Sequence, residues 1–347
     1  MKAYKIISFS LCLIFVSAAL CVPTGAVSDT TVYTAIGDSI AAGYALPSYT
    51  DDGCTPAEGY VSAFAKKLGA DTVNDLAISG IDTDGVLYLL KNDENYIECI
   101  KSADVITVSL GSNDLLTPGI EMIADALLED PDAPSDKLLD YFESADLDFM
   151  ISSIKKLAKH VEKPEQQETL RGISEKFKEN WTKVIDEIRA LNPTAEIIVT
   201  DFYNPYQIID IFAENDIIQP LLDAFNLYIN EHEYNGTEYK IAKISEIGKV
   251  VGFTNVNPIF GQMDVHPNTR GHDYIARRVW SVYSGEPFED KTETDTQSVA
   301  PETTKAPTNT TVAATSGSSG KGCSGFPAVS VLAMVFIPTA VFIKRKQ

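Results

Sequence analysis

Five short apolar runs alternate with helical patterns along this chain, and the alternation limits the folds open to it. The runs are rich in β-branched residues, as strands are, and cover residues 32–36, 72–78, 105–110, 197–202 and 239–244. Between them apolar residues recur every three or four positions, most clearly from Leu170 to Leu191. Strands that alternate with helices favour a parallel sheet covered on both faces, so we predict an α/β fold for residues 30–285.

Polar clusters directly follow the first three predicted strands. They are Gly37-Asp38-Ser39, Ser79 to Thr83, and Gly111 to Asp114. Because functional sites of parallel sheets gather at the carboxyl ends of the strands, we expect these three loops to converge. Gly-Asp-Ser alone fits a strand-to-helix turn as well as a nucleophile, since Gly tolerates positive φ and Asp and Ser cap helices.

An activated serine needs a base, usually histidine, and the chain has four histidines. His160 lies in a Lys-rich helical stretch that we interpret as a solvated face, and His232 lies at a polar helix end. His266 precedes the last predicted helix, in a loop fixed by Pro267, which suits a catalytic base. His272 lies in the first turns of that helix, where we interpret it as structural or as a partner of the base.

Acyl transfer also needs N–H donors aimed at the developing oxyanion. Three candidates follow the predicted strands: the backbone N–H of Ser39 at a helix start, the backbone N–H of Gly80, and the side-chain amide of Asn113. One edge of the sheet would then hold a nucleophile, a base and an oxyanion hole. After the nucleophile, Tyr44 and Leu46 either line the site or only pack their loop.

Four short blocks follow one another along the predicted domain. They are Gly37-Asp38-Ser39, Gly80 in NDLAISG, Gly111 to Asp114 (GSND) and His266 in DVHPN. In this order they resemble the SGNH hydrolases, also called GDSL esterases and lipases, over roughly residues 30–285. The resemblance implies a flavodoxin-like three-layer α/β/α sandwich with five parallel strands in the order 2-1-3-4-5.

The same resemblance implies roles for individual residues. Ser39 would be the nucleophile and His266 the general base, while Ser39, Gly80 and Asn113 would form the oxyanion hole. No metal or organic cofactor is implied.

The acid of the catalytic triad is the point where the chain departs from the family pattern. The family usually places it three residues before the histidine, where this chain has Met263, whereas Asp264 lies two residues before His266. In an extended segment a two-residue offset points side chains the same way, and a three-residue offset points them apart. We therefore predict that Asp264 orients His266. The alternative is that a backbone carbonyl does so, leaving a Ser–His dyad.

The two ends of the chain predict export and anchoring. Residues 1–26 combine a positive start, an apolar stretch and small residues, as signal peptides do. Residues 286–322 are rich in Thr, Ser and Pro and predict a disordered stalk. Residues 325–343 carry no charge and precede the basic tail 344–347, which predicts a single transmembrane anchor with the domain at the cell surface.

Two further features leave alternatives open. Residues 115–167 interrupt the alternation with acidic patches and amphipathic helices, so they form either a lid or substrate wall, or extra helices on the outside. Cys54 and Cys99 could form a disulfide in an exported protein or remain two lone thiols.

The formal net charge of −21 argues against nucleic-acid binding, because such a surface repels phosphates. Two hypotheses of function remain. The first is an extracellular serine esterase or lipase that hydrolyses lipid or lysophospholipid acyl esters, or carbohydrate O-acetyl esters, through an acyl-enzyme. The second is a catalytically inactive, surface-displayed binding domain on the same fold.

Overall fold

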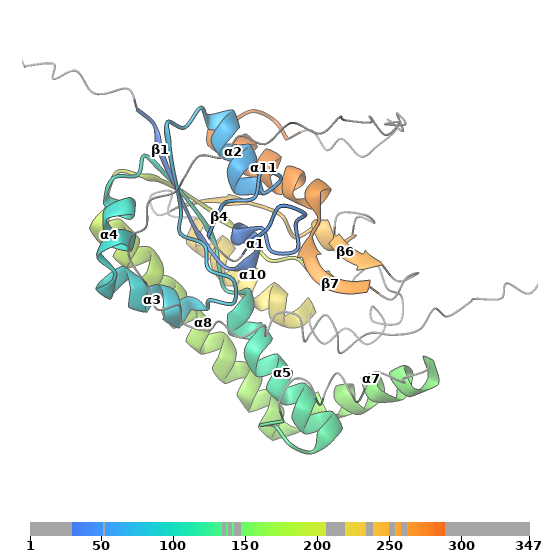
Figure 1. The fold of residues 1–347 in the computed structure, drawn as a ribbon. Coiled ribbons are helices and arrows are strands. Elements are labelled where there is room, and N and C mark those ends of the chain that lie inside the picture. Colours follow the sequence, from blue (N-terminus) through green and yellow to red (C-terminus); the bar gives the residue numbers. More distant parts are fainter. Residues whose placement is uncertain are drawn as a thin grey trace, which may run out of the picture. The chain divides into compact units, whose positions relative to one another are not determined.

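A five-stranded parallel sheet in the order β2-β1-β3-β4-β5 forms the centre of the protein (Figure 1). The computed structural model describes residues 30–50, 53–133, 137, 141, 147–205, 219–233, 239–249, 254–257 and 262–288. The strands are β1 (Val32–Gly37), β2 (Thr72–Asp75), β3 (Val105–Ser109), β4 (Glu196–Thr200) and β5 (Lys240–Ala242). The predicted fold class and strand order are confirmed.

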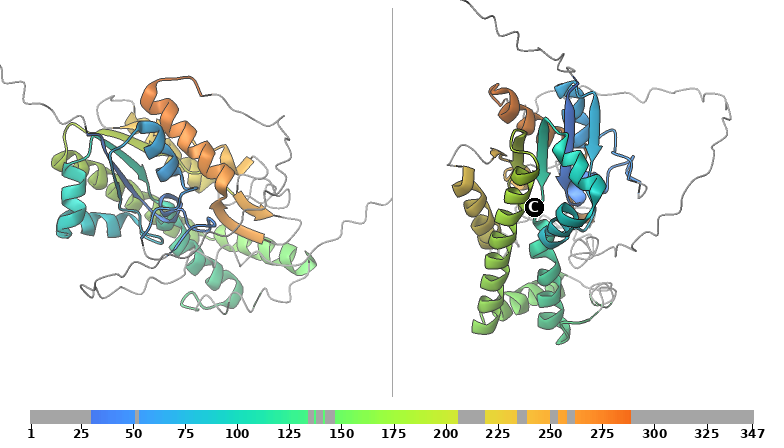
Figure 2. Two further views of the ribbon diagram at one scale, coloured as in Figure 1. Left: turned by 45° about the horizontal axis from the view of Figure 1, so that its top comes forward. Right: turned by 90° about the vertical axis from the view of Figure 1, so that its left-hand side faces the viewer.

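Helices cover both faces of this sheet, as Figures 1 and 2 show. One face carries α2 (Tyr60–Leu68) and α11 (Thr269–Ser284). The other carries α3 (Thr83–Asn92), α4 (Glu94–Lys101), α8 (Pro164–Leu191) and α10 (Gln219–Glu233). The short α1 (Ser39–Ala42) follows β1, and a 3₁₀ turn, η1 (Ile247–Lys249), follows β5.

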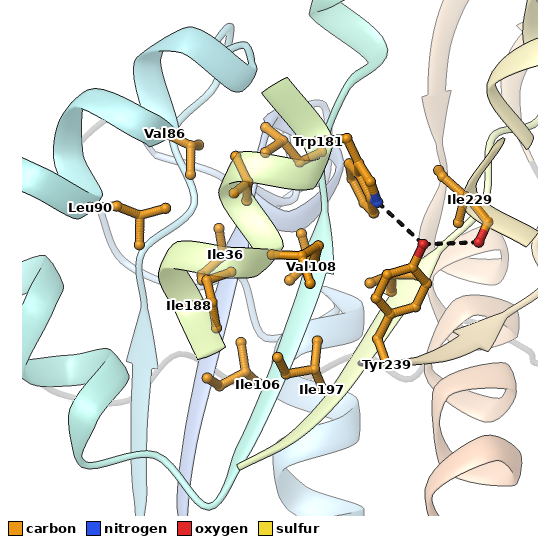
Figure 3. Packing of buried hydrophobic residues seen from close by; sticks show 14 of the residues in the cluster. Ile36, Val86, Leu90, Ile106, Val108, Trp181, Ile188, Ile197, Ile229 and Tyr239 are labelled. Atoms are coloured by element: carbon orange, nitrogen blue, oxygen red, sulfur yellow. Dashed lines mark hydrogen bonds between the residues drawn. The ribbon is translucent and has the colours of Figure 1, made fainter. Parts of the chain in front are cut away.

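Successive residues of the buried strands face opposite helical layers, which is why the apolar runs are nearly continuous. In β3, Val105 packs with the α2–α11 layer, whereas Ile106 and Val108 pack with the α3–α8 layer. Figure 3 shows the second of these clusters, where the Trp181 indole donates to the Tyr239 hydroxyl over 3.3 Å and that hydroxyl donates to the Ile229 carbonyl over 2.9 Å. The buried polar groups of Trp181 and Tyr239 are therefore both hydrogen-bonded.

The helices of the interrupting segment pack together beyond one end of the sheet. They are α5 (Ser112–Leu128), α7 (Leu147–Val161) and the first half of α8 (Figures 1 and 2). A separate apolar cluster, which includes Met122, Leu127 and Leu157, joins them. α8 starts at Pro164, before the predicted Leu170, because proline is well suited to the first position of a helix.

The interpretation of His160 as a solvated residue is wrong. Its side chain is buried between α5 and α7, with Nε2 3.0 Å from Asp125 Oδ2 and Nδ1 3.1 Å from Lys163 Nζ. A Lys-rich stretch still has one face that packs inward, and His160 lies on that face. The side chain of His232 lies outside the described residues.

The last described residues follow α11. Phe288 packs against this helix, with the Arg278 guanidinium 3.5 Å from the centre of its ring. The predicted signal peptide (1–26), anchor (325–343), basic tail (344–347) and the stalk after Phe288 lie outside the described residues. None of the described helices is both long enough and apolar enough to cross a membrane.

The two cysteines of the domain are both described, and no disulfide joins them. Cys54 is exposed and Cys99 is half-buried. Of the two alternatives that the sequence leaves open, the structure therefore shows two separate thiols and not a disulfide.

Candidate active site

Ser39 lies at the turn between β1 and α1, at the carboxyl end of the sheet. The Asp38 carboxylate caps α1 by accepting the Ile40 N–H at 3.0 Å, and the Asp38 N–H donates to the Ser109 carbonyl at 3.0 Å. A side chain at Gly37 would come within 2.5 Å of that same carbonyl, so only glycine fits between β1 and β3. Gly-Asp-Ser is thus a strand-to-helix turn, and this turn presents Ser39.

His266 and Asp264 lie on a strand, although the sequence predicted a loop there. β7 (Gln262–Pro267) pairs antiparallel with β6 (Thr254–Asn257), apart from the main sheet. His266 Nε2 lies 3.0 Å from Ser39 Oγ, and His266 Nδ1 lies 2.5 Å from Asp264 Oδ1. Strand geometry explains this contact, because residues two apart on a strand point the same way.

The hydrogen bonds indicate how the imidazole is protonated. An ionised carboxylate only accepts, so Asp264 places a proton on His266 Nδ1 and leaves the Nε2 lone pair facing the Ser39 hydroxyl. Asp264 Oδ1 also accepts the His266 backbone N–H at 3.1 Å, which holds the carboxylate in this position. The arrangement can take a proton from Ser39.

An aromatic side chain covers the imidazole. The centre of the Tyr44 ring lies 4.7 Å from that of His266, and the Tyr44 N–H donates to the Ser39 carbonyl at 2.9 Å. Leu46 is buried, so it packs the loop. Of the two residues considered after the nucleophile, Tyr44 is therefore the one at the site.

The two remaining predicted oxyanion donors lie on the loop between β2 and α3 and at the start of α5. Gly80 adopts φ +85°, and a side chain there would meet no atom within 4 Å, so its surroundings are open. Asn113 is buried at the start of α5 and donates from Nδ2 to the Ile81 carbonyl at 2.8 Å. An amide nitrogen carries two N–H bonds, so this contact uses one and fixes the direction of the other.

Burial perturbs two ionisable groups near Ser39 and His266. Burial raises the pKa of Asp38 to about 6, although the Ile40 N–H, the nearby His266 and Ser112 all favour the ionised form. Burial, together with His266, lowers the pKa of His272 to about 3. His272 Nδ1 accepts the Tyr60 N–H at 3.1 Å. Of the two interpretations of His272, the structural one fits this contact.

Asp114 contacts the site from a position to which the sequence analysis gave no role. It directly follows Asn113, and its carboxylate accepts the Thr83 N–H at 3.0 Å and also the Thr83 hydroxyl. Burial raises the pKa of Asp114 to about 6, with the Thr83 hydrogen bonds opposing the shift. An acidic residue next to a candidate oxyanion amide, in the first turn of a helix, was the available signal.

Potential metal ligands do not cluster in the described part of the chain. No group of three or more His, Cys, Asp or Glu side chains there could hold a metal ion.

Comparison with known proteins points to one family. The sequence model of the GDSL-like lipase/acylhydrolase family matches residues 35–274. The chain is 27% identical over 262 residues to an uncharacterized Bacillus subtilis (strain 168) protein, YpmR, covering 74% of this chain and 82% of that protein.

Solved structures are also similar. A lipase from a goat rumen metagenome is 19% identical, with a TM-score of 0.48, covering 73% of this chain and 97% of the lipase. An extracellular lipase from Streptomyces rimosus is 15% identical, with a TM-score of 0.48, covering 73% of this chain and 100% of the lipase.

Proposed function

Because the chain belongs to the GDSL-like lipase/acylhydrolase family of carboxylic ester hydrolases, we propose that it cleaves acyl esters through an acyl-enzyme on Ser39. The observation that carries this proposal is the 3.0 Å distance between Ser39 Oγ and His266 Nε2. It is the contact that a serine needs in order to lose its proton to a base during attack.

In the first step Ser39 Oγ attacks the ester carbonyl while His266 Nε2 takes its proton. The imidazolium that forms carries a proton on each nitrogen, and Asp264, 2.5 Å from Nδ1, stabilises that charge. Asp38 adds a second negative charge nearby, since the charges of Asp38 and His266 attract each other. His266 then returns the proton to the leaving alcohol.

The tetrahedral oxyanion would be stabilised by three N–H donors, namely the backbone N–H groups of Ser39 and Gly80 and the Asn113 amide. The open surroundings and left-handed backbone of Gly80 support its assignment, because a carbonyl can approach it closely. In the second half of the cycle a water repeats the attack on the acyl-enzyme, with His266 again as the base. This step releases the acid and restores Ser39.

The substrate is an acyl ester of a lipid or lysophospholipid, or an O-acetyl ester of a carbohydrate. A chain-length series of p-nitrophenyl esters, assayed with the full-length chain, separates these classes. We expect hydrolysis by the wild type and none above background by Ser39→Ala. Preference for long acyl chains indicates a lipid substrate, and activity confined to acetate indicates carbohydrate deacetylation. Inactivity on every ester would contradict the proposal and favour the inactive binding domain.

We also propose that the domain is exported and held at the cell surface. The composition of residues 1–26 and the uncharged stretch 325–343 followed by basic residues support this location. Protease treatment of intact cells tests it. The domain should be released into the medium, whereas protection from protease would contradict a surface location.

A further inference from the structure

Two consecutive residues at the start of α5 bind the loop between β2 and α3. Asn113 donates from Nδ2 to the Ile81 carbonyl at 2.8 Å, and Asp114 accepts both the N–H (3.0 Å) and the hydroxyl of Thr83. Gly80 directly precedes this pair of attachment points. Three hydrogen bonds therefore join the Gly80 loop to the start of α5, which carries the Asn113 amide.

Thr83 also forms a hydrogen bond with a residue of α8. Asn180 Nδ2 donates to Thr83 Oγ1 at 3.1 Å and to Asp84 Oδ1 at 2.8 Å, and Lys176 Nζ lies 2.5 Å from Asp84 Oδ2. Because the Thr83 hydroxyl accepts from Asn180, its own hydrogen points to Asp114. Asn180 therefore donates to Thr83, and Thr83 in turn donates to the Asp114 carboxylate. Thr83 and Asn180 are both buried, so their hydrogen bond is shielded from solvent.

The charge on Asp114 disfavours folding. A contact that served only stability would not need a charged group at this position. Burial, followed by the charges of Asp82 and Asp84 at the start of α3, raises its pKa to about 6. The charge of Lys176 on α8 also faces this group. The folded protein binds more proton at Asp114 than the unfolded chain does, so this contribution to stability is lost as pH rises through about 4 to 6. Asp114 is thus mainly ionised at neutral pH at the expense of stability.

We propose that Asp114 is a positioning residue for the oxyanion hole, which fixes the Gly80 loop against Asn113 by binding both donors of Thr83. This inference rests on the proposed esterase function. Asp114 does not touch the ester. It acts through Thr83, and the long helix α8 supports Thr83 from the other side through Asn180.

The substitution Asp114→Asn tests the role in the full-length chain. Its amide oxygen can accept the Thr83 N–H, but its NH₂ cannot accept the Thr83 hydroxyl proton. We expect kcat on a p-nitrophenyl ester to fall about 10- to 100-fold with KM changed less than about twofold, because the loss concerns the transition state. Tm should stay the same or rise, since a disfavoured, half-buried charge is removed. An alkylboronic acid, which forms a tetrahedral adduct with serine, should bind more weakly by a similar factor.

Two matched sets of variants complete the test. Thr83→Ser keeps the hydroxyl and should keep activity, whereas Thr83→Val should lower kcat as Asp114→Asn does. If one of these two variants folds poorly, the other still tests the role of Asp114. Asp201→Asn is the control, because Asp201 is also a carboxylate that accepts two hydrogen bonds, from the Ile244 and Ser245 N–H groups, and it is buried away from this loop. It should leave kcat unchanged.

The outcomes separate the two proposals. An active wild type whose kcat is unaffected in both Asp114→Asn and Thr83→Val would overturn the positioning role alone. Equal losses in Asp114→Asn and Asp201→Asn would overturn it too, because the effect would then follow from the loss of any hydrogen-bonded carboxylate. A wild type inactive on every ester would overturn the esterase function and this inference together.

Discussion

Two buried histidines, His266 on β7 and His272 on α11, have similar surroundings but different partners. Each lies near a tyrosine ring, with Tyr44 4.7 Å from His266 and Tyr60 6.1 Å from His272. His266 contacts a carboxylate and a hydroxyl, whereas His272 Nδ1 accepts a backbone N–H and its Nε2 has no hydrogen-bond partner among the described residues. Burial alone lowers basicity, so a carboxylate on Nδ1 is what makes a buried histidine useful as a base.

The same substitution at both histidines gives the sharpest test of this difference. His266→Asn should lower kcat/KM on a p-nitrophenyl ester by about 10⁶-fold, because no group then takes the Ser39 proton. His272→Asn should change it less than about threefold, since Asn Oδ1 can replace Nδ1 as the acceptor for Tyr60. Comparable losses in the two variants would remove the distinction between a catalytic and a structural histidine.

The next prediction concerns Asp264, the carboxylate that contacts His266 and has no counterpart at His272 among the described residues. Asp264→Asn should lower kcat by about 10⁴-fold, because an amide stabilises the wrong tautomer of His266 and does not stabilise the imidazolium. Asp273→Asn is a matched control on α11, where Asp273 is exposed and pairs with Arg277 at 2.9 Å. It should have no effect on kcat. A loss of less than about tenfold in Asp264→Asn would indicate a Ser–His dyad instead.

The sequence predicts the sheet and the residues at its edge well, because both depend on local patterns. Apolar runs mark the strands, and the loops after them carry Ser39, Gly80 and Asn113. The β6–β7 pair was missed, because its strands have only four and six residues and an irregular register. Without that strand the two-residue offset of Asp264 stayed ambiguous.

Contacts between distant residues account for the rest. Asp114 and Thr83 are 31 positions apart, and no spacing rule links them. The partner of His160 is Asp125 on another helix, which a view of α7 alone cannot show. Contacts that depend on how loops and helices pack against each other therefore cannot be predicted from the sequence and are seen only in the structure.

The smallest expected effect concerns stability and comes from His272. Its pKa is lowered to about 3 in the folded protein, so below the unfolded value of about 6.5 the unfolded chain binds the extra proton. The contribution of His272 to the free energy of unfolding therefore falls as pH drops from about 6.5, by up to about 1.4 kcal/mol for each pH unit. Asp38 and Asp114, with pKa values of about 6, change stability in the opposite direction over the same range.

These opposite pH dependences partly cancel in the stability of the wild type. The difference in unfolding free energy between the wild type and a His272 variant is therefore more informative than the pH dependence of the wild type alone. His272→Asn should unfold at lower urea than the wild type at pH 7.5, by about 1–3 kcal/mol, since a packed ring is lost. At pH 5.5 the difference should shrink by about 1.4 kcal/mol, because the variant has no histidine to protonate on unfolding while Asp38 and Asp114 are common to both. An equal difference at both pH values would mean that the folded protein accommodates a charged His272, and the contrast with His266 would then rest on partners alone.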